Sequence, residues 1–276
     1  MVKMRYFKLM LLALILFSCA EEKKEENKRN TITMFIAGDS TVADYAKNYD
    51  EGEDYYKTRY PVTGWGQVIQ PLLTAEELRK IPFITADSVV VDCRARGGRS
   101  TRTFFQEGRW RGIVEDIEPG DVVLMQFGHN DGSTSPAHAG RYVDVEGYKE
   151  FLRLFVSQTK ERGGIPVILT PVARAFPWKD GALVNVHGDY PQAAIAVAEE
   201  TNTFSIDLNA LSLALFNEKG KEFIEENYFM NFPVGKYEGY PEGSSDNTHF
   251  QTQGGIEVAK LVVEGMENLM PISTSK

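Results

Sequence analysis

The chain has 276 residues, with 30 lysines and arginines against 39 aspartates and glutamates, so its formal net charge at pH 7 is −9. An acidic chain of this kind is not expected to bind nucleic acid, because binding to phosphates needs a basic surface. Its length suits one α/β domain with a good core, and no internal repeat or second domain is visible.

The first 18 residues have the features of a secretory signal peptide. Lys3, Arg5 and Lys8 give a positive start, and the apolar run from Leu9 to Phe17 is too short to cross a bilayer of about 30 Å as a helix. Removal of residues 1–18 would take away these three basic groups and no acid, which changes the net charge from −9 to −12.

The sequence Leu-Phe-Ser-Cys at 16–19 resembles the lipobox of bacterial lipoproteins. The resemblance implies cleavage before Cys19 and lipidation of its thiol; an ordinary signal peptide with an incidental cysteine is the alternative. Residues 19–30 are almost all polar or charged and suit a flexible tether, and residues 31–276 form the predicted domain. We therefore expect a protein of the bacterial cell envelope, anchored by lipid to the outer membrane or cell surface and otherwise free of membrane, and acting as a monomer.

Strands and helices alternate along the predicted domain. Short, apolar runs predict strands at 31–37, 88–91, 121–127, 166–169 and 203–207. Apolar residues at helical spacing predict helices at 65–73, 145–162, 191–201 and 252–269. This alternation favours a three-layer α/β fold, with a five-stranded parallel sheet and helices on both faces.

Polar residues follow several of these strands directly. Ser40 comes after the first strand, Asn130 after the third, and Thr170 with Pro171 after the fourth. Ligands of such sheets bind beyond the carboxyl ends of the strands. We expect these positions to meet at one edge of the sheet.

A serine, a histidine and a carboxylate are available for nucleophilic acyl transfer. Ser40 lies in Gly-Asp-Ser-Thr, which is not the Gly-x-Ser-x-Gly elbow of α/β-hydrolases. Asp246 precedes His249 by three residues, so it can orient the ring that activates the serine. Asp39 could be a catalytic acid, but we interpret it as a structural acceptor of backbone N–H groups in the turn.

Three groups could stabilise the oxyanion of a tetrahedral intermediate. They are the backbone N–H groups of Ser40 and Gly98 and the side-chain amide of Asn130. Removing one such donor typically costs about 3–4 kcal/mol of transition-state stabilisation.

These blocks together resemble the SGNH (GDSL-type) hydrolase superfamily, which is named for a serine, a glycine, an asparagine and a histidine. The text around them is closest to rhamnogalacturonan acetylesterases: Gly-Asp-Ser-Thr at 38–41, Gly-Gly-Arg-Ser-Thr-Arg at 97–102, Gly-His-Asn-Asp at 128–131 and Asp-Asn-Thr-His-Phe at 246–250. The resemblance implies a flavodoxin-like strand order, the catalytic residues Ser40, Asp246 and His249, and an oxyanion hole made by Ser40, Gly98 and Asn130.

We assign Arg99, Trp65 and His129 to substrate binding, although His129 could instead brace the loop of Asn130. Six arginines lie between 94 and 111, namely 94, 96, 99, 102, 109 and 111. They could recognise the carboxylate of a uronate or form ion pairs with the surplus acids. We expect no cofactor and no metal, because the histidine spacing fits no zinc motif and Cys93 would be the only free thiol in the mature chain.

Three functions remain open. The first is an acetylesterase that acts on acetylated rhamnogalacturonan, either polysaccharide or oligosaccharide. The second keeps the site but acts on acetylated xylan or on a lipid or aryl ester. The third is a surface lipoprotein that binds glycans without turnover, against which the intact Ser40, Asp246 and His249 argue.

Overall fold

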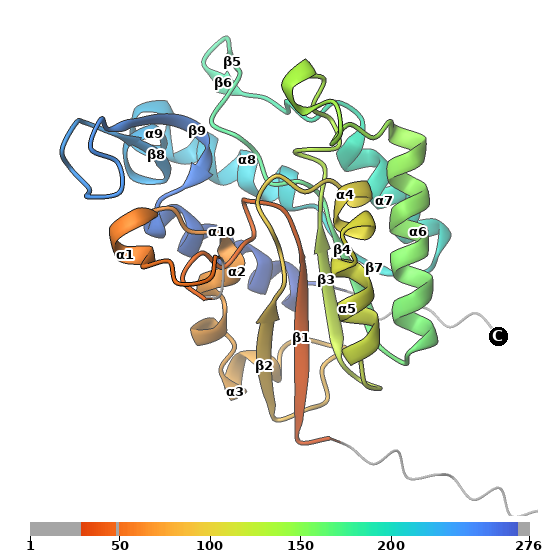
Figure 1. The fold of residues 1–276 in the computed structure, drawn as a ribbon. Coiled ribbons are helices and arrows are strands. Elements are labelled where there is room, and N and C mark those ends of the chain that lie inside the picture. The colour runs from red at the N-terminus through yellow and green to blue at the C-terminus, as the bar shows by residue number, and fades with distance from the viewer. Residues whose placement is uncertain (1–28, 48–49, 270–276) are drawn as a thin grey trace, which may run out of the picture.

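The computed structural model describes residues 29–47 and 50–269 (Figure 1). The predicted signal peptide, Cys19 and nearly all of the predicted tether lie outside these residues. Within them, no helix has the length and apolar character needed to cross a bilayer.

A five-stranded parallel sheet forms the centre of the domain. Its strands are β1 (Thr31–Gly38), β2 (Ser88–Cys93), β3 (Val122–Gln126), β4 (Ile165–Leu169) and β7 (Phe204–Ile206), in the order β2-β1-β3-β4-β7. All five predicted strands are present, and their order is the flavodoxin-like one. The predicted fold class is therefore confirmed.

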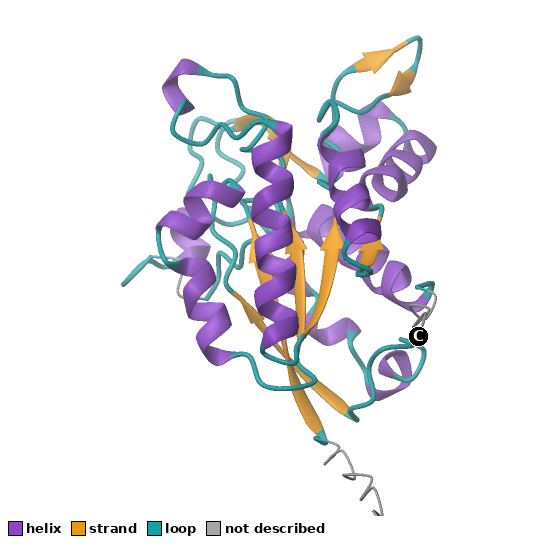
Figure 2. Cartoon of the chain, turned by 90° about the vertical axis from the view of Figure 1, so that its right-hand side faces the viewer, coloured by secondary structure: helices purple, strands orange, loops and turns teal. Residues whose placement is uncertain are grey.

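Helices form a layer on each face of the sheet. Figure 2 views the molecule from the side of the layer that is described first here. One layer holds α4 (Thr101–Gln106), α5 (Arg109–Asp116), α6 (Val145–Glu161) and α7 (Tyr190–Glu200). The other holds α2 (Trp65–Val68), the 3-10 turn η1 (Gln70–Leu72), α3 (Ala75–Leu78), α8 (Leu208–Lys219) and α10 (Thr252–Glu267). The predicted helix at 65–73 is split because Pro71 has no N–H with which to continue α2.

The alternation of side chains along β1 separates two apolar cores. Met34 and Ile36 pack with the layer of α2, α8 and α10, whereas Phe35 and Ala37 pack with the layer of α4 to α7. All four side chains are at most 3% exposed, as expected for a strand that is covered on both faces.

Smaller elements gather beyond the carboxyl ends of the strands, at the top of Figure 1. They are the antiparallel pair β8 (Phe229–Phe232) and β9 (Ser244–Phe250), the hairpin of β5 (Trp178–Lys179) and β6 (Ala182–Leu183), and the short helices α1 (Tyr55–Thr58), η2 (Pro136–His138) and α9 (Lys221–Asn227). None of these was predicted. The two-stranded sheets lie where ligands of parallel sheets bind.

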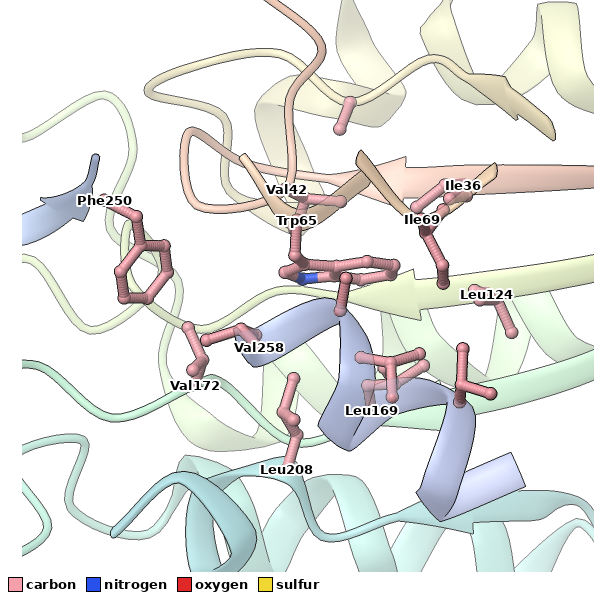
Figure 3. Close-up of a cluster of buried hydrophobic side chains, with 14 of the residues drawn as sticks. Ile36, Val42, Trp65, Ile69, Leu124, Leu169, Val172, Leu208, Phe250 and Val258 are labelled. Carbon is pink, nitrogen blue, oxygen red and sulfur yellow. The ribbon is translucent and has the colours of Figure 1, made fainter. Parts of the chain in front are cut away.

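Trp65 lies inside the core, not in a ligand-binding position (Figure 3). None of its surface is exposed, so the prediction that it binds substrate is wrong. Its indole N–H donates to Oε1 of Gln126 at 2.9 Å, and Nε2 of Gln126 donates to Oγ1 of Thr41 at 2.8 Å. Trp65 thus starts a buried chain of hydrogen bonds that runs through Gln126 to Thr41, the residue after Ser40.

We expect Trp65→Phe to lower the free energy of unfolding by about 1–3 kcal/mol, because it leaves Oε1 of Gln126 buried without its donor. Chemical denaturation measures this change. Trp110→Phe is the matched control: it removes the same N–H, but its partner Gln158 is half-buried and can turn to water. Equal losses of stability in the two variants would contradict the importance of the buried chain.

Candidate active site

Ser40 lies in a tight turn directly after β1. The carbonyl of Asp39 accepts the N–H groups of Val42 and Ala43 at 3.3 and 3.1 Å, and Oδ1 of Asp39 accepts the N–H and the hydroxyl of Thr41, both at 2.9 Å. The side chain of Asp39 is fully buried, which fits the structural role predicted for it. These bonds fix the direction in which Ser40 leaves the strand.

His249 stands on an irregular segment of β9. Phe229 of β8 pairs with Phe250, but the next residue, Met230, pairs with Asp246, so residues 247–249 bulge out of the ladder. Bulges of this kind redirect side chains, often beside active sites. Here the bulge brings the ring of His249 back over the carboxylate that precedes it by three residues.

The three predicted catalytic residues form one hydrogen-bonded chain. Nε2 of His249 lies 2.8 Å from Oγ of Ser40, and its Nδ1 lies 2.6 Å from Oδ2 of Asp246. The other carboxylate oxygen, Oδ1 of Asp246, accepts the N–H groups of Thr248 at 2.8 Å and His249 at 3.1 Å. These distances are short enough for proton transfer between serine and histidine.

The carboxylate of Asp246 is held in its charged form. Burial alone would raise its pKa, but the hydrogen bond and charge of His249 and two backbone N–H groups outweigh burial and lower the pKa below its ordinary value. An ionised Asp246 accepts a hydrogen bond from Nδ1 of His249 and leaves Nε2 free to take a proton from Ser40.

The predicted oxyanion groups line the same cleft as this chain. Ser40, Gly98 and Asn130 all border a cleft of about 520 Å³ together with Asp246 and His249. Gly98 has a φ of +77°, a left-handed conformation that glycine adopts without strain. One N–H of the Asn130 amide donates to the carbonyl of Arg99 at 3.0 Å, and the amide has a second N–H to offer.

Asp131 joins the loops that carry the second and third oxyanion groups. Its Oδ1 accepts the N–H of Thr101 at 3.0 Å and the Thr101 hydroxyl at 2.5 Å, and its Oδ2 accepts the N–H of Gly128 at 3.1 Å. Burial raises the pKa of Asp131 to about 7, in spite of these bonds, and the charge of Asp39 adds to the effect. Burial likewise raises the pKa of Asp39 to about 6.

His129 borders the cleft but is only 5% exposed. Its Nδ1 accepts a hydrogen bond from Nε of Arg174 at 3.3 Å, and its carbonyl accepts one from the same guanidinium at 3.2 Å. Burial and the neighbouring His187 and Arg174 hold the pKa of His129 well below its ordinary value, so the ring is neutral. Its Nδ1 can therefore accept from Arg174, and the ring lies in the wall of the cleft, where its part in substrate binding stays a prediction.

Arg99 does not reach the cleft. Its guanidinium donates to Oε2 of Glu107 at 3.0 Å and to the carbonyl of Gly97 at 2.7 Å, and only its backbone carbonyl touches the site, through Asn130. The prediction that its side chain binds substrate is therefore wrong.

Most of the arginines between 94 and 111 form ion pairs with acidic side chains, which was the alternative to recognition of a uronate carboxylate. The pairs are Arg94 with Asp92 and Asp116, Arg96 with Asp50, Arg99 and Arg109 with Glu107, and Arg111 with Glu115. The guanidinium of Arg102 donates to the carbonyl of Gly140.

Three other arginines border the cleft, Arg59, Arg141 and Arg174, and sequence reasoning missed them. Arg174 follows the strand β4 by five residues, so the rule that ligands bind beyond carboxyl ends could have pointed to it. Arg59 and Arg141 lie in irregular segments far from any motif, and no signal in the sequence marks them. Within the described part of the chain, no group of three or more histidine, cysteine, aspartate or glutamate side chains is arranged to hold a metal.

A three-layer α/β fold that assembles a serine, a histidine and an aspartate beyond its sheet is an architecture for nucleophilic acyl transfer. Residues 36–254 match the model of the GDSL-like lipase/acylhydrolase family. The chain belongs to this family and is a carboxylic ester hydrolase.

Two similar proteins come from Bacillus subtilis (strain 168). The rhamnogalacturonan acetylesterase RhgT is 36% identical over 241 residues, which cover 87% of this chain and 92% of RhgT. The probable rhamnogalacturonan acetylesterase YesY is 36% identical over 244 residues, with 88% and 96% covered.

Solved structures share the fold. The crystal structure of protein YxiM from Bacillus subtilis superposes with a TM-score of 0.66 at 27% identity and covers 87% of this chain and 57% of YxiM. That of Axe2, an acetylxylan esterase from Geobacillus stearothermophilus, superposes with a TM-score of 0.54 at 16% identity, with 90% and 99% covered. At that identity, the likeness to Axe2 shows the fold alone.

The raised pKa of Asp131 predicts a pH-dependent stability. The folded protein holds this proton up to about pH 7, whereas an unfolded chain releases it near the ordinary value of 3.8. Because the folded state binds the extra proton between these values, the free energy of unfolding falls as the pH rises from about 4 to 7, by a few kcal/mol in order of magnitude. In Asp131→Asn this part of the slope disappears.

Urea denaturation at pH 5 and pH 8 measures the difference. We expect the stability of Asp131→Asn relative to wild type to be higher at pH 8 than at pH 5, whatever the loss of one acceptor costs at both. Asp189→Asn, at an exposed position without a side-chain cap bond, should run parallel to wild type. An Asp131→Asn curve that also runs parallel to wild type would refute the assignment.

Proposed function

We propose that the protein is a carbohydrate acetylesterase that removes O-acetyl groups from rhamnogalacturonan or a related pectic chain. The observation that carries the proposal is the hydrogen-bonded chain from Ser40 through His249 to Asp246 in an open cleft. The substrate class is supported by the 36% identity to RhgT over most of both chains.

The reaction begins with attack of Oγ of Ser40 on the acetyl carbonyl carbon. Nε2 of His249 takes the hydroxyl proton, and Asp246 stabilises the imidazolium that forms. His249 then gives this proton to the sugar oxygen as the C–O bond of the ester breaks, which leaves an acetyl group on Ser40. Water attacks this acetyl-enzyme with His249 as base, and acetate leaves while Ser40 regains its proton.

The oxyanion that forms in each step has donors beside it. The N–H groups of Ser40 and Gly98 and the second amide N–H of Asn130 belong to the same cleft. Hydrogen bonds to Asp39 and Asp131 hold the segments that carry these groups, so little reorganisation is needed at the moment of reaction.

The lining of the cleft favours a sugar over a long acyl chain. Charged, hydroxyl and aromatic side chains dominate it, with Val62 and Met230 as its aliphatic members. Tyr240, which also borders the cleft, offers a ring on which a sugar can pack. A lipase needs a large apolar acyl pocket, and the described part of this cleft has none.

We expect the wild type to release acetate from acetylated rhamnogalacturonan faster than from acetylated xylan. Ser40→Ala should lose at least about 10⁴-fold in kcat on both and on p-nitrophenyl acetate, because the nucleophile is gone. Acetate release, measured with a coupled assay, reports all three. Activity that survives in Ser40→Ala would disprove the role of Ser40. A preference for xylan would disprove the substrate, and binding of pectin without turnover would favour a glycan-binding protein.

Asn130→Ala should lower kcat on p-nitrophenyl acetate by about 10²–10³-fold, because it removes an oxyanion donor that acts in the transition state. KM should change much less than kcat. Asn227→Ala is the matched control, since Nδ2 of Asn227 also donates to a backbone carbonyl, that of Phe223 at 2.9 Å, but outside the cleft. Similar kinetics in the two variants would exclude Asn130 from the oxyanion site.

A further inference from the structure

The loop from Asn130 to Val143 forms one wall of the cleft. Four of its residues, Asn130, Ser133, His138 and Arg141, border the cleft beside the catalytic chain. Hydrogen bonds hold both ends of the segment: the N–H of Val143 donates to the carbonyl of Asp131 at 3.0 Å, and that of Arg141 donates to the carbonyl of His138 at 2.8 Å. These two bonds therefore fix the backbone on both sides of Arg141.

The guanidinium of Arg141 lies directly against Gly98. A Cβ atom added to Gly98 would stand 2.9 Å from one terminal nitrogen of Arg141 and 3.0 Å from its guanidinium carbon. Because Gly98 has no side chain, the charged group can settle beside the oxyanion site, where it is half-buried. Arg102 donates to the carbonyl of Gly140 at 2.7 Å and so supports the backbone just before Arg141.

The other two arginines of the cleft are engaged within the protein. Arg59 forms ion pairs with Asp50 at 2.6 Å and Glu53 at 2.7 Å. Arg174 donates to His129, and the charges of Asp39 and Asp246 act on it. Among the described residues of the cleft, both are therefore compensated.

Arg141, by contrast, forms no ion pair with any carboxylate of the described residues. The chain has nine more acidic than basic residues, and many of its lysines and arginines form ion pairs with aspartate or glutamate. A half-buried guanidinium without an anion offers a planar pair of donors to a ligand carboxylate.

We propose that Arg141 binds a uronate carboxylate of the bound polysaccharide and so selects acidic polysaccharides over neutral ones. The inference rests on the proposed function and adds to it a specificity-determining residue and the anionic class of the ligand. A carboxylate contact of this kind forms in the ground state and persists in the transition state, so it acts on KM more than on kcat.

The test compares acetylated rhamnogalacturonan oligosaccharides with the same oligosaccharides after chemical reduction of their carboxyl groups. For each enzyme we measure the ratio of kcat/KM on the acidic substrate to kcat/KM on the reduced one. Arg141→Gln should lower this ratio about tenfold or more, mainly through KM on the acidic substrate. Arg141→Lys keeps the charge but loses the planar fork, and should lie between wild type and Arg141→Gln.

Arg111→Gln is the matched control. Its side chain is 80% exposed, pairs with Glu115 at 2.7 Å and lies outside the cleft, so the ratio should stay at the wild-type value. A ratio unchanged in Arg141→Gln overturns the inference. An equal fall in kcat on both substrates also overturns it, because the guanidinium then acts on the oxyanion and not on a substrate carboxylate.

A binding experiment separates this inference from the proposed function. In the Ser40→Ala background, calorimetry with non-acetylated acidic oligosaccharides should show binding at least tenfold weaker when Arg141→Gln is added. Equal binding in the two variants overturns the inference. If wild type hydrolyses p-nitrophenyl acetate but neither oligosaccharide, the proposed function fails, and the calorimetric result still decides the role of Arg141.

Discussion

The site depends on one buried carboxylate that serves two loops. Asp131 accepts hydrogen bonds from Thr101 on one side and from Gly128 on the other, and thereby fixes the segment of Gly98 relative to that of Asn130. Oxyanion donors act only where their positions are set in advance, within a few tenths of an ångström. Burial of this acid is unfavourable, as its raised pKa shows, and the alignment of the two segments offsets that cost.

Around this link, the proposed catalytic residues come from two parts of the fold. The parallel sheet supplies the turns that hold Ser40, Gly98 and Asn130, each just beyond the end of a strand. The proposed base, His249, comes from the antiparallel β8–β9 pair, which lies outside the five-stranded sheet. Specificity is assigned to a third source, the long loop that carries Arg141.

The sequence predicted those features that repeat a pattern or stand in a motif. Uniformly apolar runs marked the strands, and the blocks around Ser40 and His249 pointed to residues that the structure brings together. β9 escaped prediction because it faces the cleft: its segment Ser244–Phe250 is mostly polar and only Phe250 is buried. Trp65 was misassigned because its burial depends on tertiary packing, which the spacing of residues in the sequence does not show. Arg99 was misassigned for the same reason, since its ion pair with Glu107 forms only in the folded chain.

The bulge in β9 has a consequence for motion within the catalytic chain. Asp246 is the paired residue that borders the bulge and His249 lies within it, and Oδ1 of Asp246 accepts the backbone N–H groups of both His249 and Thr248. Any displacement of the β8–β9 ribbon would therefore move Asp246 and His249 together. Of the hydrogen bonds that link Ser40, His249 and Asp246, the 2.8 Å contact between His249 and Ser40 is the one that joins the ribbon to the turn after β1, so it is the bond whose length such a displacement would change.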